Sequence, residues 1–447
     1  MSTRSIFWFR RDLRLSDNPA LLAAIAESDE VIPLFILDPL IADRAGEFRR
    51  AYLAQSLRSL DASLENKLHV RAGDPVGILK DLMKEYDVTS VHVSADFAPY
   101  GVARDARVES AGIELRRTGS GYAIAPGRVL KKDQSPYRVF TPFFNAWREH
   151  GWRLPVAPPT TVNAAVPTAE NRQLPDWKIP RGAQLQIAGE EAALRRWREF
   201  KEGGLRDYDQ RRDFASSNGT SRLSPHLRWG EIHPRTILAG LGESRAHQLF
   251  RKEIAWREFY ADVLHHNPQT SRDYYISHFA KMKYDDPGEK FVAWCEGRTG
   301  YPYVDAAMRQ LRQEGWMHNR ARMVVASFLV KDLHMEWQHG ANYFMKFLID
   351  NDVASNSHGW QWTAGCGTDA SPYFRIFNPI EQGRRFDPQG DYIRRYIPEL
   401  AHLTASQIHE PWLHAHIGYP EPIVDHAVER MESLARLQKL KELRQEN

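Results

Sequence analysis

The opening part of the chain alternates short apolar runs with longer segments whose apolar residues recur at helical spacing. The apolar runs predict five buried strands, at Ser5–Phe9, Val31–Leu37, Leu68–Arg71, Val88–Val93 and Ile113–Arg117. Strands that alternate with helices over short loops form a parallel sheet with helices on both faces. This alternation limits the possible folds more than any other feature, and it predicts an α/β domain with a Rossmann-like sheet over residues 1–130.

Two helix starts in this region carry capping signals. Asp17 or Asn18 can cap a helix with Pro19 in its first turn, and Asp74 precedes a second proline. The turn after the first strand has no glycine, and the Gly119-Ser120-Gly121 sequence follows the wrong strand and lacks a third glycine. We therefore expect a structural α/β domain without a dinucleotide-binding loop.

A proline-rich stretch separates this region from the rest of the chain. The segment Arg153 to Arg181 contains six prolines and few periodic apolar positions, so it cannot form one regular element. We predict an inter-domain linker over residues 131–187. From residue 188 to residue 447 the apolar spacing is helical nearly throughout, which predicts an all-α second domain.

Charge and composition exclude several classes of protein. The formal net charge of +3 permits a local basic face but predicts no general affinity for polyanions. Two cysteines are too few for a disulfide framework or a four-sulfur zinc site, and free thiols fit a reducing compartment. No apolar run reaches the length of a membrane span, and the first residues are too weakly apolar for a signal peptide. We expect a cytoplasmic protein.

The densest group of candidate functional residues lies in Ile349–Pro379. Two acids, Asp350 and Asp352, are followed by Asn356 and Trp360, and a second indole comes two residues later. A bound aromatic cofactor with an electron path leading to it would use all of these groups. A tryptophan-rich core with capping acids would use them too, so this stretch alone leaves both interpretations open.

A second candidate site is the segment Gly219-Thr220-Ser221-Arg222-Leu223-Ser224-Pro225. Ser224 is suited to cap a helix whose first residue is Pro225. Backbone N–H groups at a helix start, hydroxyl donors and a guanidinium together can cradle a diphosphate. An ordinary capped helix needs only the serine and the proline, so the added polar residues favour anion binding.

Two helical faces elsewhere combine polar and aromatic residues. Glu253, Trp256 and Arg257 share one face of a predicted helix, with a tyrosine a further turn along. Such a face suits recognition of a flat heterocycle, although a partly exposed helix with an internal ion pair would look the same. Asn319 and Arg322 share a face of a later helix. No histidine in the chain has companions at metal-ligand spacing, and there is no Walker loop or catalytic triad.

Taken together, these stretches resemble the photolyase/cryptochrome family, and most closely its class I cyclobutane pyrimidine dimer photolyases. The motifs are FWFRRDLRLSDNPAL, GTSRLSP, WREFY, GYPYVDAAMRQL, GWMHNRARM, LIDNDVASNSHGWQW and FRIFNPIEQGRRFD. They occur in the family's order and spacing, and they cover essentially the whole chain. The resemblance implies that the all-α domain, residues 188–447, binds FAD and DNA, and that the α/β domain holds an antenna chromophore.

The resemblance also implies the residues that hold FAD. Arg322 would pair with Asp350 beside the flavin ring, and Asn356 matches the residue that faces flavin N5. The implied cofactor-binding residues are Tyr208, Thr220, Ser221, Arg222, Leu223, Ser224, Arg322, Asp350, Asn351, Asp352 and Asn356.

The implied activity is light-driven repair of pyrimidine dimers in damaged DNA, by electron transfer from reduced anionic FAD to a flipped-out dimer. Glu253, Asn319 and Asn356 match the catalytic positions. The implied DNA- and substrate-binding residues are Arg212, Glu253, Trp256, Arg257, Tyr260, Asn319, Arg320, Met323, Trp362 and Gln382. The family expectation is a monomer.

Two positions depart from the family pattern. The electron chain to the surface usually has three tryptophans, and Trp360 and Trp337 match the first two, but the third position is Tyr284. We predict that the path ends on this tyrosine or detours to a nearby indole such as Trp294. Folate-type members carry an Asn-Glu pair near Tyr100, which this chain lacks. This predicts 8-hydroxy-5-deazaflavin as the antenna in preference to methenyltetrahydrofolate.

The main alternative function is a blue-light receptor of the same family that signals without repairing DNA. Asn356 and the complete set of substrate residues argue against it. Repair of (6-4) photoproducts is a closer alternative, but it needs a histidine pair in the pocket, and His318 beside Asn319 does not match such a pair.

Overall fold

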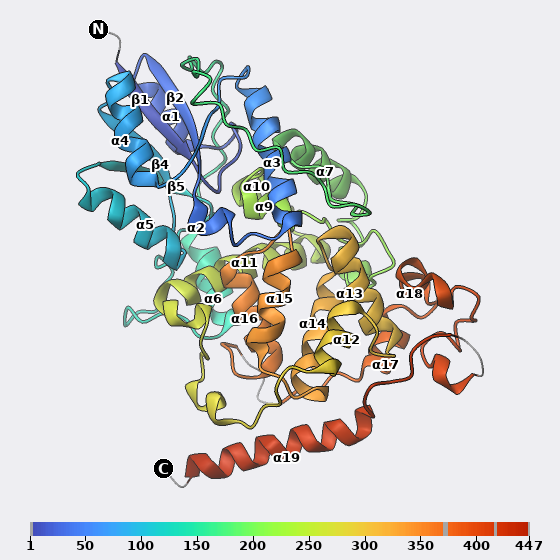
Figure 1. The fold of residues 1–447 in the computed structure, drawn as a ribbon. Coiled ribbons are helices and arrows are strands. Elements are labelled where there is room, and N and C mark those ends of the chain that lie inside the picture. Colours follow the sequence, from blue (N-terminus) through green and yellow to red (C-terminus); the bar gives the residue numbers. More distant parts are fainter. Residues whose placement is uncertain (1–2, 370–373, 415–417, 446–447) are drawn as a thin grey trace. The chain divides into compact units, whose positions relative to one another are not determined.

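The computed structural model of the protein describes residues 3–369, 374–414 and 418–445 (Figure 1). It divides into two compact units that interleave along the chain. The first contains Met1–Arg181, Leu185–Arg206 and Ser221–Pro268, and the second contains Gly182–Gln184, Asp207–Thr220 and Gln269–Asn447. The long helix α11 (Arg245–His266) and the GTSRLSP segment from its serine onward therefore belong to the sheet-containing unit, although the sequence predicted one helical domain from residue 188.

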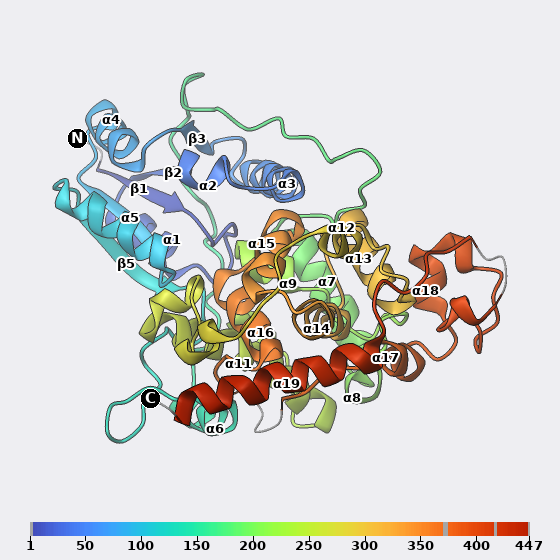
Figure 2. The ribbon, with the colours of Figure 1, turned by 60° about the horizontal axis from the view of Figure 1, so that its bottom comes forward.

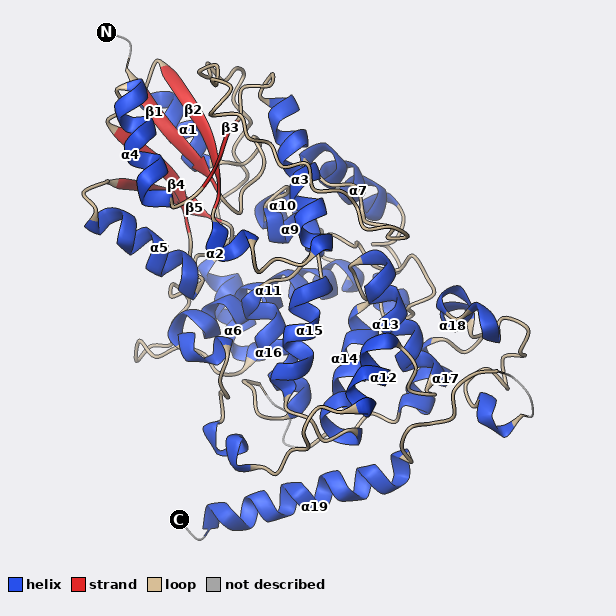
Figure 3. Ribbon diagram, viewed as in Figure 1, coloured by secondary structure: helices blue, strands red, loops and turns tan. Residues whose placement is uncertain are grey.

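The first unit is built on a five-stranded parallel sheet, as predicted. Its strands are β1 (Arg4–Phe9), β2 (Glu30–Leu37), β3 (His69–Ala72), β4 (Ser90–Ala95) and β5 (Leu115–Ser120), in the order β3-β2-β1-β4-β5. Figure 3 shows these strands together near the N-terminus. Along β1, Ile6 and Trp8 pack in one apolar cluster with helices α4 and α5, while the alternating Phe7 and Phe9 point to the opposite face. Burial on both faces explains the nearly continuous apolar runs.

The described part of the first unit also contains ten helices: α1 (Pro19–Glu27), α2 (Pro39–Ala42), α3 (Glu47–Ser63), α4 (Pro75–Tyr86), α5 (Pro99–Ser110), α6 (Phe140–His150), α7 (Glu190–Glu202), α9 (Ser224–Trp229), α10 (Pro234–Ala239) and α11. The capping predictions are confirmed at two of them. Asn18 accepts a hydrogen bond from the Leu21 N–H at the start of α1, and Asp74 accepts from Val76 and Gly77 at the start of α4.

Helix α6 lies inside the span that was predicted to be linker, and the sequence analysis missed it. Its buried residues are Phe140, Phe143, Phe144 and Trp147, which follow helical spacing. The later part of the linker has no regular element between Arg153 and Arg181, as predicted. It runs along the sheet instead, because the Val31 and Val70 N–H groups donate to linker carbonyl oxygens at 2.9 and 2.7 Å.

The second unit is helical in its described residues. It comprises α8 (Tyr208–Arg211), α12 (Glu289–Glu296), α13 (Pro302–Glu314), α14 (Asn319–Ser327), α15 (Trp337–Phe347), α16 (Val353–Ala364), α17 (Pro379–Phe386), α18 (Asp391–Tyr396) and α19 (His426–Gln445), with a π-helical turn at Phe328–Asp332 and short 3-10 turns at Ser277–Lys281, Pro398–Leu400 and Pro411–Leu413; another 3-10 turn, Pro268–Ser271, spans the boundary with the first unit.

Three helices of this unit carry eight of the predicted site residues: Asn319, Arg320, Arg322 and Met323 on α14, Trp337 on α15, and Asn356, Trp360 and Trp362 on α16. Helix α16 packs against both α14 and α15 (Figure 2). Their contact buries one apolar cluster that includes Val324, Phe344 and Trp360. A β-carbon on Gly340 would lie 2.1 Å from the Trp360 ring, so this glycine lets α15 approach the indole closely. Among the described residues, no helix is both long enough and apolar enough to cross a membrane.

Candidate functional site

An acid–guanidinium pair forms the centre of the predicted cofactor site in the second unit. Arg322 on α14 donates from Nη2 to Asp350 Oδ2 at 2.7 Å and from Nη1 to Oδ1 at 3.3 Å. Its Nε donates to the Met317 carbonyl oxygen at 2.8 Å, which fixes the orientation of the guanidinium group. The Asp350 side chain is 1% exposed and that of Arg322 is 26% exposed. The predicted ion pair is confirmed, and the guanidinium keeps one accessible side.

The residues after Asp350 start helix α16 in the way the sequence suggested. Asn351 is buried, and its amide donates to the Met345 carbonyl oxygen at 2.9 Å. Asp352 is the N-cap and accepts the Ser355 N–H at 3.0 Å. One turn later the Asn356 amide donates to the Ala341 carbonyl oxygen at 3.0 Å. These bonds hold the acids and the amide in fixed positions at one end of α16.

Trp360 is surrounded by aromatic rings. Its ring centroid is 5.0 Å from that of Phe344 and 6.2 Å from that of Trp294. On α15, Trp337 meets Tyr274 edge-on at 6.2 Å, and Tyr274 stacks against Tyr284 at 6.3 Å. The sequence analysis missed Phe344 and Tyr274. Phe344 lies seven residues after Trp337, so helical spacing could have revealed it, but no local pattern marks Tyr274.

The second unit also contains six of the predicted substrate residues. Arg320 pairs with Asp213 at 2.8 Å, and its guanidinium lies 4.3 Å from the Phe386 ring centroid. The predicted substrate residues on helices of this unit are Asn319, Arg320 and Met323 on α14, Trp362 on α16 and Gln382 on α17. The remaining one, Arg212, follows α8 and lies 5.8 Å from the Tyr208 ring. The fold brings Arg320 and Met323 together on one helix, and the DNA role of these residues stays a prediction.

The predicted diphosphate cradle is divided between the two units after Thr220. Helix α9 begins at Ser224 itself, with Leu223 in the N-cap position, so the prediction that Ser224 is the N-cap is wrong by one residue. Arg222 has a φ of 52°, a left-handed conformation that is strained for a residue with a side chain. The Ser221 hydroxyl accepts the Leu223 N–H at 3.3 Å and helps to stabilise this turn.

Helix α11 of the first unit carries the other predicted substrate residues. Glu253 is half-buried, and Trp256 stacks face to face on Phe140 with centroids 3.8 Å apart. Tyr260 lies one turn further, 5.3 Å from Trp256. Arg257 donates to the Gly121 and Leu227 carbonyl oxygens at 3.0 and 3.3 Å. Its guanidinium therefore has partners inside this unit, and its contact with DNA stays a prediction.

Arg257 also lines a pocket at the carboxyl ends of β1 and β4. These strands are neighbours at the point where the strand order reverses, which is where open parallel sheets bind ligands. The pocket is lined by Arg10, Arg11, Asp12, Ser94, Ala95, Asp96, Gly121, Tyr122 and Arg257. Burial opposes ionisation of Asp96, but the charges of Arg11, Arg104 and Arg10 outweigh it and lower the pKa of this carboxyl. The pocket therefore holds both charges.

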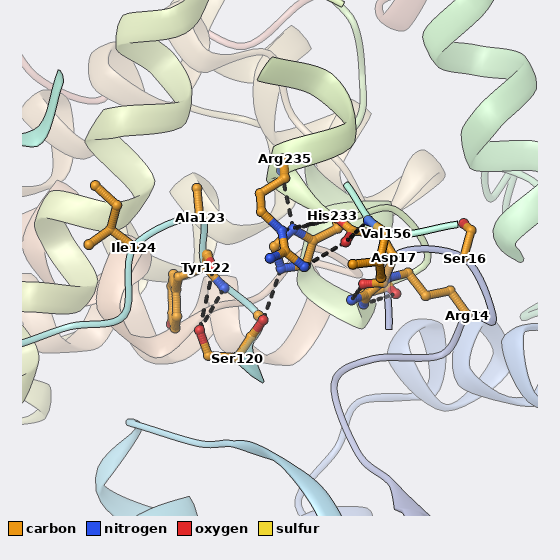
Figure 4. A network of polar contacts seen from close by, with 12 residues as sticks. Arg14, Ser16, Asp17, Ser120, Tyr122, Ala123, Ile124, Val156, His233 and Arg235 are labelled. Carbon is orange, nitrogen blue, oxygen red and sulfur yellow. Dashed lines mark hydrogen bonds and ion pairs between the residues drawn. The ribbon is translucent and has the colours of Figure 1, made fainter. Parts of the chain in front are cut away.

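A buried polar network connects Asp17, which follows one segment that lines this pocket, with Ser120, which precedes another (Figure 4). His233 donates from Nε2 to the Ser120 carbonyl oxygen at 2.9 Å, and its Nδ1 accepts the Arg235 N–H at 3.1 Å. Burial lowers the pKa of His233 to about 4 although the Asp17 carboxylate lies 3.2 Å from its Nδ1, so the ring is neutral at pH 7. Asp17 pairs with the Arg235 side chain and accepts the Val156 N–H at 3.0 Å. The sequence analysis did not identify this network.

Comparison with known proteins relates both the N-terminal and the C-terminal part of the chain to one family. Residues 5–163 match the family described as DNA photolyase, and residues 250–439 match the FAD binding domain of DNA photolyase. A deoxyribodipyrimidine photo-lyase of Agrobacterium fabrum is 40% identical over 463 residues, which cover 96% of each chain.

Solved structures agree with the sequence matches. A bacterial class III photolyase from Agrobacterium tumefaciens is 39% identical with a TM-score of 0.94, covering 99% of this chain and 98% of its own. An archaeal photolyase from Sulfolobus tokodaii, solved with two FAD molecules, is 30% identical with a TM-score of 0.86, covering 98% of this chain and 100% of its own.

The match of residues 250–439 to an FAD binding domain places this chain among the flavoproteins. The chain belongs to the DNA photolyase family. The sequence motifs suggested class I of this family, whereas the similar structure from Agrobacterium tumefaciens is a class III photolyase. The comparisons therefore support the family but not class I.

Proposed function

We propose that this protein is a deoxyribodipyrimidine photo-lyase that repairs cyclobutane pyrimidine dimers in DNA with blue light. The observation that carries this proposal is the 40% identity to a protein of that name over 96% of both chains. The site supports it, because Arg322, Asp350, Asn356 and Trp360 lie on two helices that pack against each other and on the turn that leads into one of them.

The residues of the second unit fit an anionic flavin. A guanidinium carries five N–H donors in a rigid fork, and Arg322 directs three of them to Met317 and Asp350. Its accessible side can therefore donate to an anionic ligand. Asn356 presents an amide, which hydrogen-bonds without adding a titrating group. When bound, reduced FAD supplies the light-excited electron that splits the dimer, and the electron returns at the end.

The substrate residues then act on the dimer. Glu253 hydrogen-bonds the flipped bases, and the indoles of Trp256 and Trp362 each offer an aromatic face that stacks on bases. Asn319 and Met323, both on α14, also contact the substrate. A dimer stacks poorly in the duplex, which lowers the cost of flipping it out. The protein acts as a monomer, and its two free thiols suit the cytoplasm.

Binding of a damaged oligonucleotide tests the role of Glu253. The reduced holoprotein is expected to bind DNA with one thymine dimer roughly 10³-fold more tightly than undamaged DNA. Blue light should remove this preference, because the product no longer has a dimer. Glu253→Ala is expected to weaken dimer binding, measured by fluorescence anisotropy. Glu191→Ala serves as the control, since that carboxylate is 88% exposed. Equal affinity for damaged and undamaged DNA would contradict the proposal.

We also propose that the pocket of the first unit holds the antenna, an 8-hydroxy-5-deazaflavin. Its arginines suit an anionic flat ligand, and a related photolyase solved with two FAD molecules supports a second flavin-sized site. At the start of α5, a β-carbon on Gly101 would lie 2.2 Å from the Asp96 carboxyl. Tyr100 donates to Asp38 there, so this turn packs against Asp38 and Asp96. Its sequence lacks the Asn-Glu pair of the folate-type members.

Extraction of the protein from its native source checks the antenna. We expect FAD together with a deazaflavin, identified by mass and absorbance. Reconstitution should show the same preference, and Arg11→Ala should weaken deazaflavin binding because that guanidinium lines the pocket. Arg116→Ala, a half-exposed arginine on β5, is the matched control. Recovery of folate, or of a second FAD, in equal amount to the protein would contradict the proposed antenna but not the proposed repair activity.

A further inference from the structure

Two tyrosines lie beyond Trp337, and their hydroxyl groups have different surroundings. The Tyr274 hydroxyl donates to Glu336 Oε1 at 2.9 Å. The Tyr284 hydroxyl donates to the Phe279 carbonyl oxygen at 3.3 Å. A carboxylate is a base that can accept a proton, whereas a backbone carbonyl is not. Only Tyr274 therefore has a direct partner that can take its proton.

Tyrosine oxidation depends on such a partner. Burial of Tyr274 raises the pKa of its hydroxyl, so the phenol is neutral before it loses an electron. Losing the electron without the proton would leave a positive charge in a side chain that is 5% exposed, and low-dielectric surroundings disfavour that charge. Glu336 is half-buried next to the ring and can pass the proton on to solvent.

The indoles of the path have no comparable partner. In the part of the chain that the structure describes, no acceptor lies within hydrogen-bonding distance of Nε1 of Trp337 or Trp360. Trp294 donates from Nε1 to the Val325 carbonyl oxygen at 3.1 Å, which is not a base. An oxidised Trp337 therefore keeps its proton and its positive charge. It remains a strong oxidant 6.2 Å, centroid to centroid, from the Tyr274 ring.

We infer that Tyr274 and Glu336 form a proton-coupled redox pair that ends the Trp360–Trp337 path, an inference that rests on the proposed flavoprotein function. The oxidant is a light-excited, oxidised flavin, which takes one electron from Trp360, and Trp337 refills that indole. Tyr274 then gives one electron to the Trp337 cation, its O–H bond breaks, and the proton moves to Glu336 Oε1. The products are a neutral indole, a neutral tyrosyl radical and a protonated carboxyl group. A thiol in solution returns the electron, and the tyrosine recovers a proton.

Flash photolysis of the holoprotein with oxidised FAD tests this pair, with transient absorption and electron paramagnetic resonance as readouts. We expect a tyrosyl radical that grows as the indole cation decays, with a slower transfer in D₂O. Tyr274→Phe should remove this radical, and Glu336→Gln should slow its formation roughly 10²-fold, because the amide accepts the hydrogen bond but not the proton. FAD content and thermal unfolding establish that each variant is folded.

Two further variants separate this pair from its neighbours. Tyr284→Phe should retain the tyrosyl radical, because Tyr274 keeps its carboxylate. Tyr343→Phe is the matched control, since that ring lies 5.6 Å from Trp294 and its hydroxyl donates to a backbone carbonyl. A radical lost in Tyr284→Phe but retained in Tyr274→Phe would overturn the inference. So would an indole radical as the last species in the wild type. Absence of any flavin photoreduction would contradict the proposed function instead.

Discussion

Arg322→Met is expected to lose FAD during purification. The substitution leaves the Asp350 carboxylate, 1% exposed, without the guanidinium that holds it by two hydrogen bonds. Removing one partner of a buried charged hydrogen bond costs about 2–3 kcal/mol. The flavin loses its positive neighbour at the same time. Flavin absorbance per protein and chemical unfolding of the holoprotein measure the two effects.

An ion pair of the same unit whose carboxylate is exposed supplies the control. Arg309 pairs with Glu399 at 2.6 Å, but the two side chains are 25% and 37% exposed. Arg309→Met is expected to cost less than about 1 kcal/mol, because solvent screens such pairs. It should keep FAD at the wild-type ratio. If Arg322→Met also keeps a full complement of FAD, the pair does not form part of the cofactor site.

Trp360→Phe is expected to reduce photoreduction of bound, oxidised FAD to the limit of detection. The predicted path to Trp337 starts at this indole, and its ring also contacts Phe344 and Trp294. A phenyl ring keeps an aromatic side chain at this position but is much harder to oxidise than an indole. The rate of flavin bleaching under blue light with an added thiol measures the effect.

Single substitutions further along should be milder than Trp360→Phe, because each leaves the other indole intact. Trp337→Phe and Trp294→Phe are each expected to leave partial photoreduction, and the double variant should resemble Trp360→Phe. Trp412→Phe, an indole that packs against Tyr301, is the control. Full photoreduction in Trp360→Phe would show that electrons enter the flavin site by another route.

The sheet was predictable because its signals are local. Buried parallel strands need apolar residues on both faces, and the caps of α1 and α4 hydrogen-bond within two or three residues. Helix α6 was not predicted, because the prolines that follow it indicate a linker. Its buried aromatic residues nevertheless have helical spacing. The boundary of the two units was not predictable from composition, since α11 groups with the sheet through long-range packing.

The site was predictable where a resemblance supplied partners that lie far apart in the sequence. The Arg322–Asp350 pair is of this kind, and the structure confirms it at 2.7 Å. Nothing in the sequence connects Tyr274 with Glu336 or Trp337, because their contact arises only when the segment before α12 packs on α15. The network around Asp17 and His233 was hidden for the same reason.

The most direct test of the proposed function is repair itself. The purified protein, with its FAD reduced, is bound to an oligonucleotide with one thymine dimer and illuminated with blue light. Recovery of thymine absorbance is followed beside a dark sample and Glu253→Ala. The proposed function predicts recovery only in the light, and less of it in the variant. No recovery with reduced FAD bound would contradict it and favour a light receptor that does not repair DNA.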